Sequence, residues 1–178
     1  RGRAEFRVGN LLDTGYDSDS FDFCVSNGVF HHLNRDDLPL AVAEVTRVLR
    51  NGGWFWYYID GSGAISNDLW NTTVKILADV DVRTIESVLH IMNVSRNKMI
   101  HIVDSTSATY YHSDYDEVIA ELTQAGFGEF RRMKGGDVLD YAYDQMIFGT
   151  DDAHNDTDAY ALEKFGTGPI RIVCKLLS

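Results

Sequence analysis

Residues 20–60 read SFDFCVSNGVFHHLNRDDLPLAVAEVTRVLRNGGWFWYYID. The stretch holds two largely apolar runs of strand length, at 21–26 and 54–59, which are typical of buried parallel strands. Between them, the apolar residues from Leu38 to Leu49 recur at the spacing of one helix face. A strand, a helix and a strand in this order predict a parallel, right-handed crossover unit and therefore an α/β fold.

The predicted helix has its own start and stop signals. Asp36 or Asp37 can cap its N-terminus, and Pro39 stands in its first turn. Asn51-Gly52-Gly53 supplies the left-handed residue with which helices commonly end. We therefore expect the helix to end in this triplet, just before the second strand begins.

The remaining elements are shorter. A short strand is expected at residues 4–8. Strand candidates at 127–133 and 170–176 predict a C-terminal antiparallel strand pair. Helical patterns within residues 64–112 predict a helical cap insertion that follows the second strand of the crossover unit.

A second well-marked helix is expected between this insertion and the strand pair. Ser113 and Asp116 form a capping-box pattern at its start, and Gly126 ends it. The last two strands are separated by residues 137–167, which are rich in Asp and Tyr. A connection of that length is unusual in a compact domain, so we expect an acidic excursion with a function or with local helices.

Composition and charge restrict the class of protein. The chain has 178 residues, of which 44% are hydrophobic and 24% charged, as expected of a single globular domain. Its net charge is −11, and residues 104–163 hold fourteen acidic against three basic residues. Because nucleic acids and anionic membranes attract clustered Lys and Arg, we expect neither as a partner. The oligomeric state stays open.

Other patterns bear on metals and on the cellular compartment. Cys24 and Cys174 both lie in apolar runs, so they are interpreted as small buried residues, and no metal site is predicted. No apolar stretch has the length of a membrane helix, and residues 1–5 lack the apolar region of a signal peptide. We therefore expect a cytoplasmic location.

Four local patterns carry the chemistry. They are Phe6-Arg7-Val8-Gly9-Asn10, Ser20-Phe21-Asp22-Phe23-Cys24-Val25-Ser26-Asn27, Val29-Phe30-His31-His32-Leu33 and Glu44-Val45-Thr46-Arg47-Val48-Leu49-Arg50-Asn51-Gly52-Gly53. In this order and spacing they resemble the class I S-adenosylmethionine-dependent methyltransferases, in particular the type 11 methyltransferase domain. The resemblance is close over residues 4–60 and looser over 113–133 and 168–177.

The resemblance implies a Rossmann-like methyltransferase sheet and S-adenosyl-L-methionine as cofactor. Asn10 stands where the family places an acid that reads the adenine amino group, and Leu11 follows it. Ser26, Asn27 and Gly28 stand where the family's backbone contacts the methionine part of the cofactor. Their position at the end of a parallel strand agrees with ligand binding in open α/β sheets, and a plain loop is the alternative.

The family's glycine-rich loop and ribose-binding acid have no counterpart in the chain. The resemblance therefore implies a methyltransferase domain truncated at its N-terminal side, whose sheet is incomplete there and whose own activity is in doubt. The missing strands would leave residues 4–8 unpaired and make residues 21–26 an apolar exposed edge, prone to association. Asp60-Gly61-Ser62-Gly63 is the one glycine-rich turn after a strand, and it gives a weaker alternative, a nucleotide-dependent oxidoreductase.

Residues for the acceptor side follow from side-chain chemistry. His32 is the candidate catalytic base, since an imidazole can take a proton from a hydroxyl or amine as the methyl group arrives. His31, Trp70, Tyr110 and Tyr111 are candidate substrate-binding residues. For each of these, packing in the core or over the sheet edge is the alternative.

The sequence thus favours an enzyme, a methyltransferase acting on a small-molecule acceptor. A different class stays open, namely a non-catalytic α/β binding module that derives from a methyltransferase and has lost cofactor binding. The acidic region favours a neutral or cationic acceptor.

Overall fold

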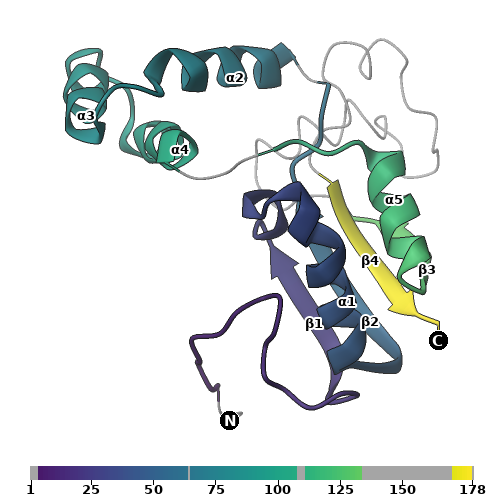
Figure 1. Cartoon of the computed structure of the whole chain (residues 1–178). Helices are drawn as coiled ribbons and strands as arrows, with labels where there is room; N and C mark the ends of the chain where they lie inside the picture. The colour runs from purple at the N-terminus through teal and green to yellow at the C-terminus, as the bar shows by residue number, and fades with distance from the viewer. Residues whose placement is uncertain (1–3, 64, 108–110, 134–169, 178) are drawn as a thin grey trace.

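The computed structural model describes residues 4–63, 65–107, 111–133 and 170–177. Its centre is a four-stranded sheet with the order β1-β2-β4-β3 (Figure 1). The strands are β1 (Phe21–Asn27), β2 (Leu49–Ile59), β3 (Phe127–Arg132) and β4 (Ile170–Leu176). β1 runs parallel to β2, and β4 is antiparallel to both β2 and β3. The predicted α/β fold with a C-terminal antiparallel strand pair is confirmed.

The helices form two groups. They are α1 (Leu38–Val48), α2 (Ile65–Leu77), α3 (Val82–Ile91), α4 (Arg96–Ser107) and α5 (Tyr115–Gln124), with the 3-10 turns η1 (Phe30–His32) and η2 (Arg35–Asp37). Figure 1 shows α1 and α5 lying along the sheet, while α2, α3 and α4 stand beyond the carboxyl end of β1. Residues 64–112, where the sequence predicts a helical insertion, thus hold this second group.

The hydrophobic core lies between one face of the sheet and the two helices α1 and α5. Alternate residues of β2 point into it, so Phe55, Tyr57 and Ile59 are at most 2% exposed. Alternate residues of β4 and the apolar stripes of both helices complete the same core: Ile170, Ile172, Cys174, Leu176, Ala41, Val42, Val45, Val118 and Leu122.

The opposite face of the sheet is more open. Trp54, Trp56 and Tyr58 of β2 point to it and are only partly buried. Phe23 and Val25 of β1 pair with the two tryptophans and are 52% and 62% exposed. The edge strand β1 therefore presents apolar side chains to solvent on this face.

The strand predicted at residues 4–8 is wrong. The structure assigns no regular element there, and Phe6 and Val8 are almost fully exposed. A strand is stabilised by hydrogen bonds to a neighbouring strand, and in the described part of the chain none runs alongside this segment.

Helix α1 also ends differently from the prediction. It ends at Val48, and β2 begins at Leu49, so the triplet 51–53 belongs to the strand. The register of β1 against β2 shifts between Phe21 and Phe23, which accommodates the extra residues. Gly53 lies at this irregularity, where a Cβ atom would stand 2.8 Å from the Arg50 carbonyl oxygen.

Two predicted helix caps are corrected as well. Asp37 occupies the N-cap of α1, but its carboxylate accepts a hydrogen bond from Asn34 Nδ2 (3.0 Å) and makes no capping bond. The N-cap of α5 is Asp114, whose carboxylate accepts from the Asp116 amide (2.8 Å), and not Ser113. Gly126 follows α5 with a φ of 95°, as its predicted role at the helix end requires.

Both cysteines are free thiols, and burial raises the pKa of each, that of Cys174 to about 12. None of the helices described here is long and apolar enough to cross a membrane. The predicted acidic excursion at 137–167 lies outside the described residues.

Candidate functional site

The parallel strands β1 and β2 end side by side, and this end carries most of the candidate residues. Asn27 pairs with Tyr58, and the amide of Gly28 donates a hydrogen bond to the Tyr58 carbonyl (3.2 Å). Gly28 has a φ of 66°, a left-handed conformation that a glycine adopts without strain. The chain then turns into η1, so His31 and His32 follow at the carboxyl end of the sheet, where open α/β sheets bind ligands.

Residues 111–113 cross this end of the sheet. The Tyr111 amide donates to the His31 carbonyl (3.2 Å), and the Tyr111 hydroxyl donates to the Phe30 carbonyl (3.1 Å). The Ser113 amide donates to the Asp60 carbonyl (2.9 Å), and Ser113 forms a parallel bridge with Gly61. The segment is therefore fastened to the ends of both parallel strands.

The two adjacent histidines have different environments. His31 is 5% exposed, whereas His32 is exposed. Their rings meet edge to face with centroids 4.4 Å apart. Burial lowers the pKa of His31, and the charge of Asp60 partly opposes this shift, so His31 is neutral near pH 7.

Asp60 and His112 join this cluster, although the sequence patterns did not single them out. The Tyr58 hydroxyl donates to Asp60 Oδ1 (2.6 Å), and the Arg171 guanidinium lies over the Tyr58 ring, 4.8 Å from its centroid. Burial lowers the pKa of His112, and Asp60 again opposes the shift. In the sequence, Asp60 belongs to the glycine-rich turn at 60–63. No sequence pattern pairs it with a histidine fifty residues away.

A hollow of about 330 Å³ runs along β1, from Phe21 at its start to Ser26 near its carboxyl end, and α1 contributes Val45 and Val48 to its lining. Leu11, Ser26 and Val29 are among its lining residues, so the structure brings together two of the predicted cofactor residues. Ser26 is 6% exposed, and its hydroxyl has no hydrogen-bond partner among the described residues. A buried hydroxyl normally has a partner, so this one is available to a ligand in the hollow.

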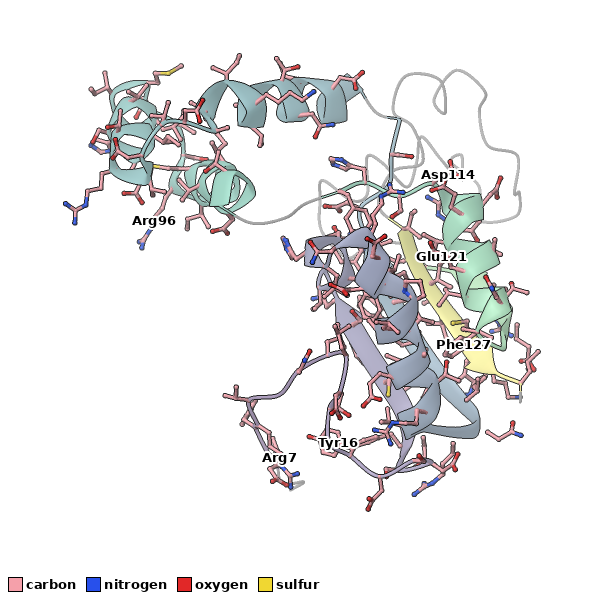
Figure 2. All side chains as sticks on the ribbon, in the orientation of Figure 1. Arg7, Tyr16, Arg96, Asp114, Glu121 and Phe127 are labelled. Carbon is pink, nitrogen blue, oxygen red and sulfur yellow. The ribbon has the colours of Figure 1, made fainter. Side chains whose placement is uncertain are left out.

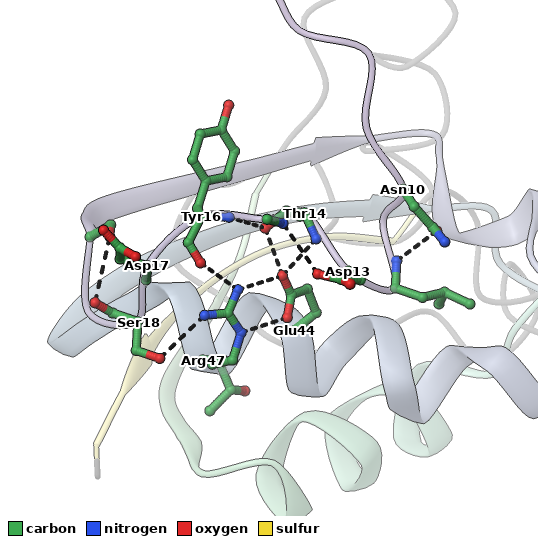
Figure 3. Close-up of polar contacts among 12 residues, drawn as sticks. Asn10, Asp13, Thr14, Tyr16, Asp17, Ser18, Glu44 and Arg47 are labelled. Atoms are coloured by element: carbon green, nitrogen blue, oxygen red, sulfur yellow. Dashed lines mark hydrogen bonds and ion pairs between the residues drawn. The ribbon is translucent and has the colours of Figure 1, made fainter.

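A buried carboxylate holds the loop that carries Leu11 (Figure 3). Glu44 on α1 accepts hydrogen bonds from the Thr14 amide (2.8 Å) and hydroxyl (2.6 Å) and from Arg47 Nε (2.7 Å). Arg47 also donates to the Tyr16 carbonyl (2.7 Å). The Arg47 and Thr14 hydrogen bonds lower the pKa of Glu44 to about 2. We call Thr14, Tyr16, Glu44 and Arg47 the loop clasp.

The other predicted residues are placed as follows. Asn10 is exposed, and its side-chain oxygen accepts from the Leu12 amide (3.0 Å), which turns the loop toward Leu11. Tyr111 is half-buried beneath the Arg35 guanidinium (5.0 Å from the ring centroid), and burial raises its pKa to about 12. Trp70 belongs to α2, and Tyr110 lies outside the described residues.

No cluster of three or more His, Cys, Asp or Glu side chains suited to a metal ion occurs within the described ranges.

Comparison with known structures shows which fold the chain shares. The chain resembles S-adenosylmethionine-dependent methyltransferases from Thermotoga maritima (15% identity, TM-score 0.52) and Methanosarcina mazei (16% identity, TM-score 0.55). It also resembles the YcgJ protein of Bacillus subtilis (16% identity, TM-score 0.51). The alignments cover 94%, 99% and 96% of this chain but only 62%, 68% and 70% of the respective structures.

The fold is thus that of the class I S-adenosylmethionine-dependent methyltransferases. Residues 1–57 of the chain match the family model described as a methyltransferase domain. This match covers the loop at Asn10, strand β1, the two histidines and α1, which are the segments that carry the sequence resemblance. No curated protein sequence matches the chain.

Proposed function

We propose that this protein binds S-adenosylmethionine and transfers its methyl group to a small-molecule acceptor. The observation that carries the proposal is the hollow in which Leu11 and Ser26 meet. Both were expected to contact the cofactor, they come from segments fifteen residues apart, and the buried Ser26 hydroxyl offers a hydrogen bond to a ligand. When bound, the cofactor supplies a methyl group on a sulfonium, which is already strongly electrophilic.

The residues of the chain would share the binding as follows. Asn10 and Leu11 would contact the adenine, with their loop held in place by the loop clasp. Ser26, Asn27 and Gly28 would contact the methionine part through the backbone and the Ser26 hydroxyl. Because the left-handed turn at Gly28 is fixed by its bond to Tyr58, this strand end is preorganised for binding.

The acceptor side would be formed around η1. His32 is the exposed member of the histidine pair and serves as the sequence-based candidate for the proton acceptor. The His31 ring packs edge to face against the His32 ring, and Tyr111, whose ring lies under the Arg35 guanidinium, would border the site. The helices α2, α3 and α4 stand beyond this end of the sheet and would cover the acceptor, with Trp70 as a candidate contact (Figure 2).

A small neutral or cationic acceptor fits the charge distribution. Fourteen acidic and three basic residues occupy 104–163, which disfavours a nucleic acid partner. The Thermotoga maritima structure is described as a possible histamine N-methyltransferase, and histamine is a small cation of this kind. A cytoplasmic location belongs to the same proposal.

Isothermal titration calorimetry of the 178-residue chain with S-adenosylmethionine tests the proposal. We expect saturable binding, and we expect Ser26→Ala to weaken it about 5-fold through the lost hydrogen bond. Ser87→Ala, an exposed serine on α3, is the matched control and should bind like the wild type. Absence of binding by the wild type would contradict the proposal for this chain.

A second candidate function is a non-catalytic binding module. It is favoured by the apolar edge of β1, where Phe23 and Val25 are more than half exposed. In that case a partner would pair with β1 and the cofactor would not bind. The calorimetric experiment distinguishes the two functions, because only the enzyme requires the hollow at Ser26.

A further inference from the structure

The bridge between Gly61 and Ser113 fixes the register of two side chains that are far apart in sequence. Because residues 61 and 113 are partners in a parallel bridge, Asp60 and His112 occupy equivalent positions on adjacent segments. Side chains at equivalent positions of neighbouring extended segments lie on the same face. The charge of Asp60 accordingly acts on the pKa of His112.

The Asp60 carboxylate is itself held in place. The Tyr58 hydroxyl donates to Oδ1 at 2.6 Å, a short and strong bond to an ionised acceptor. Tyr58 in turn lies under the Arg171 guanidinium of the neighbouring strand β4. The carboxylate is therefore oriented by two strands of the sheet.

We propose that His112 is the catalytic base on the acceptor side of the site and that Asp60 is its positioning residue. This rests on the proposed methyl transfer and deepens it, since a base is useful only when the acceptor reacts through an oxygen or nitrogen that carries a proton. The acceptor is therefore a small hydroxyl or amine compound.

The step balances as follows. The proton of the acceptor's O–H or N–H group passes to an imidazole nitrogen of His112. The electron pair on the acceptor atom forms the new bond to the methyl carbon, and the pair of the broken carbon–sulfur bond stays on sulfur. The carboxylate of Asp60 stabilises the imidazolium that results, as carboxylates do beside catalytic histidines.

The surroundings of His112 agree with this role. Two other titratable or charged groups interact with it from neighbouring elements. His31 on η1 interacts electrostatically with His112, and the Arg35 guanidinium on η2 donates to the His112 carbonyl (3.3 Å). Half-burial lowers the pKa of His112, which favours the unprotonated imidazole that can accept a proton, while Asp60 favours the protonated form. His32, in contrast, stands exposed above His31.

A histidine titration tests the pair without cofactor. The six histidines are followed by NMR in the wild type, in Asp60→Asn and in Tyr58→Phe. We expect Asp60→Asn to lower the pKa of His112 by about one unit, Tyr58→Phe to lower it by less, and the exposed His90 to be unchanged. An unchanged pKa of His112 in Asp60→Asn would overturn the proposal.

Kinetics identify the base. With radiolabelled S-adenosylmethionine, histamine serves as the amine probe and catechol as the hydroxyl probe. We expect His112→Gln to lower kcat about 100-fold with little change in KM, and to remove the acidic limb of the pH profile. His90→Gln is the control and should retain both. Loss of that limb in His32→Gln but not in His112→Gln would overturn the assignment.

Failure of the two proposals can be told apart. If the chain does not bind S-adenosylmethionine, the proposed function fails, whatever the titration shows. If the cofactor binds but Asp60→Asn leaves His112 unshifted, only the pair fails. A lowered pKa of His112 together with cofactor binding supports both.

Discussion

The two faces of strands β1 and β2 are both lined by apolar and aromatic residues but differ in how far other elements cover them. On the face toward α1 and α5, Phe55 and Ile59 are completely buried. On the other face, Trp54 and Trp56 of the same strand are only partly buried, and Phe23 of β1 is 52% exposed. A run such as WFWYYI therefore indicates a strand, but it does not tell which face a neighbouring layer covers.

The difference also separates the hydrophobic core from the polar cluster at Asp60. The covered face supplies most of the buried apolar area, which dominates the free energy of folding. The polar cluster of Tyr58, Asp60 and Arg171 stands on the open face, at the carboxyl end of the sheet. We expect substitutions on the covered face to change the free energy of unfolding most, and the four predictions below follow this order.

The largest effect is expected for Phe55→Ala. Phe55 is fully buried and its ring lies 5.3 Å from that of Tyr57 and 5.6 Å from that of Phe127, so truncation leaves a cavity. We expect urea unfolding to show a loss of about 4 kcal/mol. Trp56→Ala, next to it on the open face, should cost about 1–2 kcal/mol. Equal losses would show that both faces are equally covered in solution.

The loop clasp joins α1 to the loop that precedes β1. We expect Glu44→Gln to weaken this loop clasp. Loss of charge-assisted hydrogen bonds to Thr14 and Arg47 should reduce the free energy of unfolding by about 2 kcal/mol at pH 7. Glu86→Gln, an exposed glutamate on α3, is the control and should change little.

The contribution of Glu44 to the free energy of unfolding should depend on pH. The pKa of Glu44 falls from 4.5 to about 2 on folding, so its contribution is complete above pH 4.5. It decreases as the pH falls from 4.5 to about 2 and is fully lost only below the folded-state pKa, where the carboxylate is protonated in both states. The difference between wild type and Glu44→Gln in urea unfolding should therefore shrink over this range. A difference that stays constant down to pH 2 would contradict the assignment of the charge.

The sequence predicted the central fold because its signals are local. The crossover unit of β1, α1 and β2 follows from apolar periodicity, and β4 was placed at its observed bounds, 170–176. Residues 4–8 were misassigned because an apolar pattern does not guarantee a hydrogen-bonding neighbour. The end of α1 was misplaced because Gly52 and Gly53 serve a strand irregularity as readily as a helix end.

The candidate site was predicted only in part, for a similar reason. The family pattern names Leu11 and Ser26, which line one hollow in the structure, and their contact with a cofactor stays a prediction. Asp60 and His112 were missed because their proximity depends on a bridge between segments that are fifty residues apart. The periodicity of apolar residues indicates which face of a helix or strand a residue occupies. It does not indicate which distant segment will pair with that residue.

Gly28 directly follows the last residue of β1, and Gly28→Ala tests the turn at this strand end. With a φ of 66° the backbone is left-handed, and a Cβ atom would stand 3.6 Å from His31 and Tyr58, which is ordinary contact. The cost is thus conformational, and we expect a loss of about 1–2 kcal/mol in urea unfolding. Gly9→Ala, with open space around it and no positive φ, is the control and should be neutral. A neutral Gly28→Ala would mean that the strand end is not held in this turn.

The smallest effect on stability is expected at the open face, where Phe23→Lys sharpens the comparison most directly. Phe23 is about half exposed on an edge strand, so its replacement should change the free energy of unfolding by less than about 0.5 kcal/mol. An apolar edge strand pairs readily with other chains, and a lysine there opposes pairing. Sedimentation velocity should show concentration-dependent association of the wild type that Phe23→Lys reduces. Ile76→Lys, at a more exposed position on α2 (71% against 52%), should leave association unchanged. Equal reduction by both variants would assign the effect to net charge and not to the edge of β1.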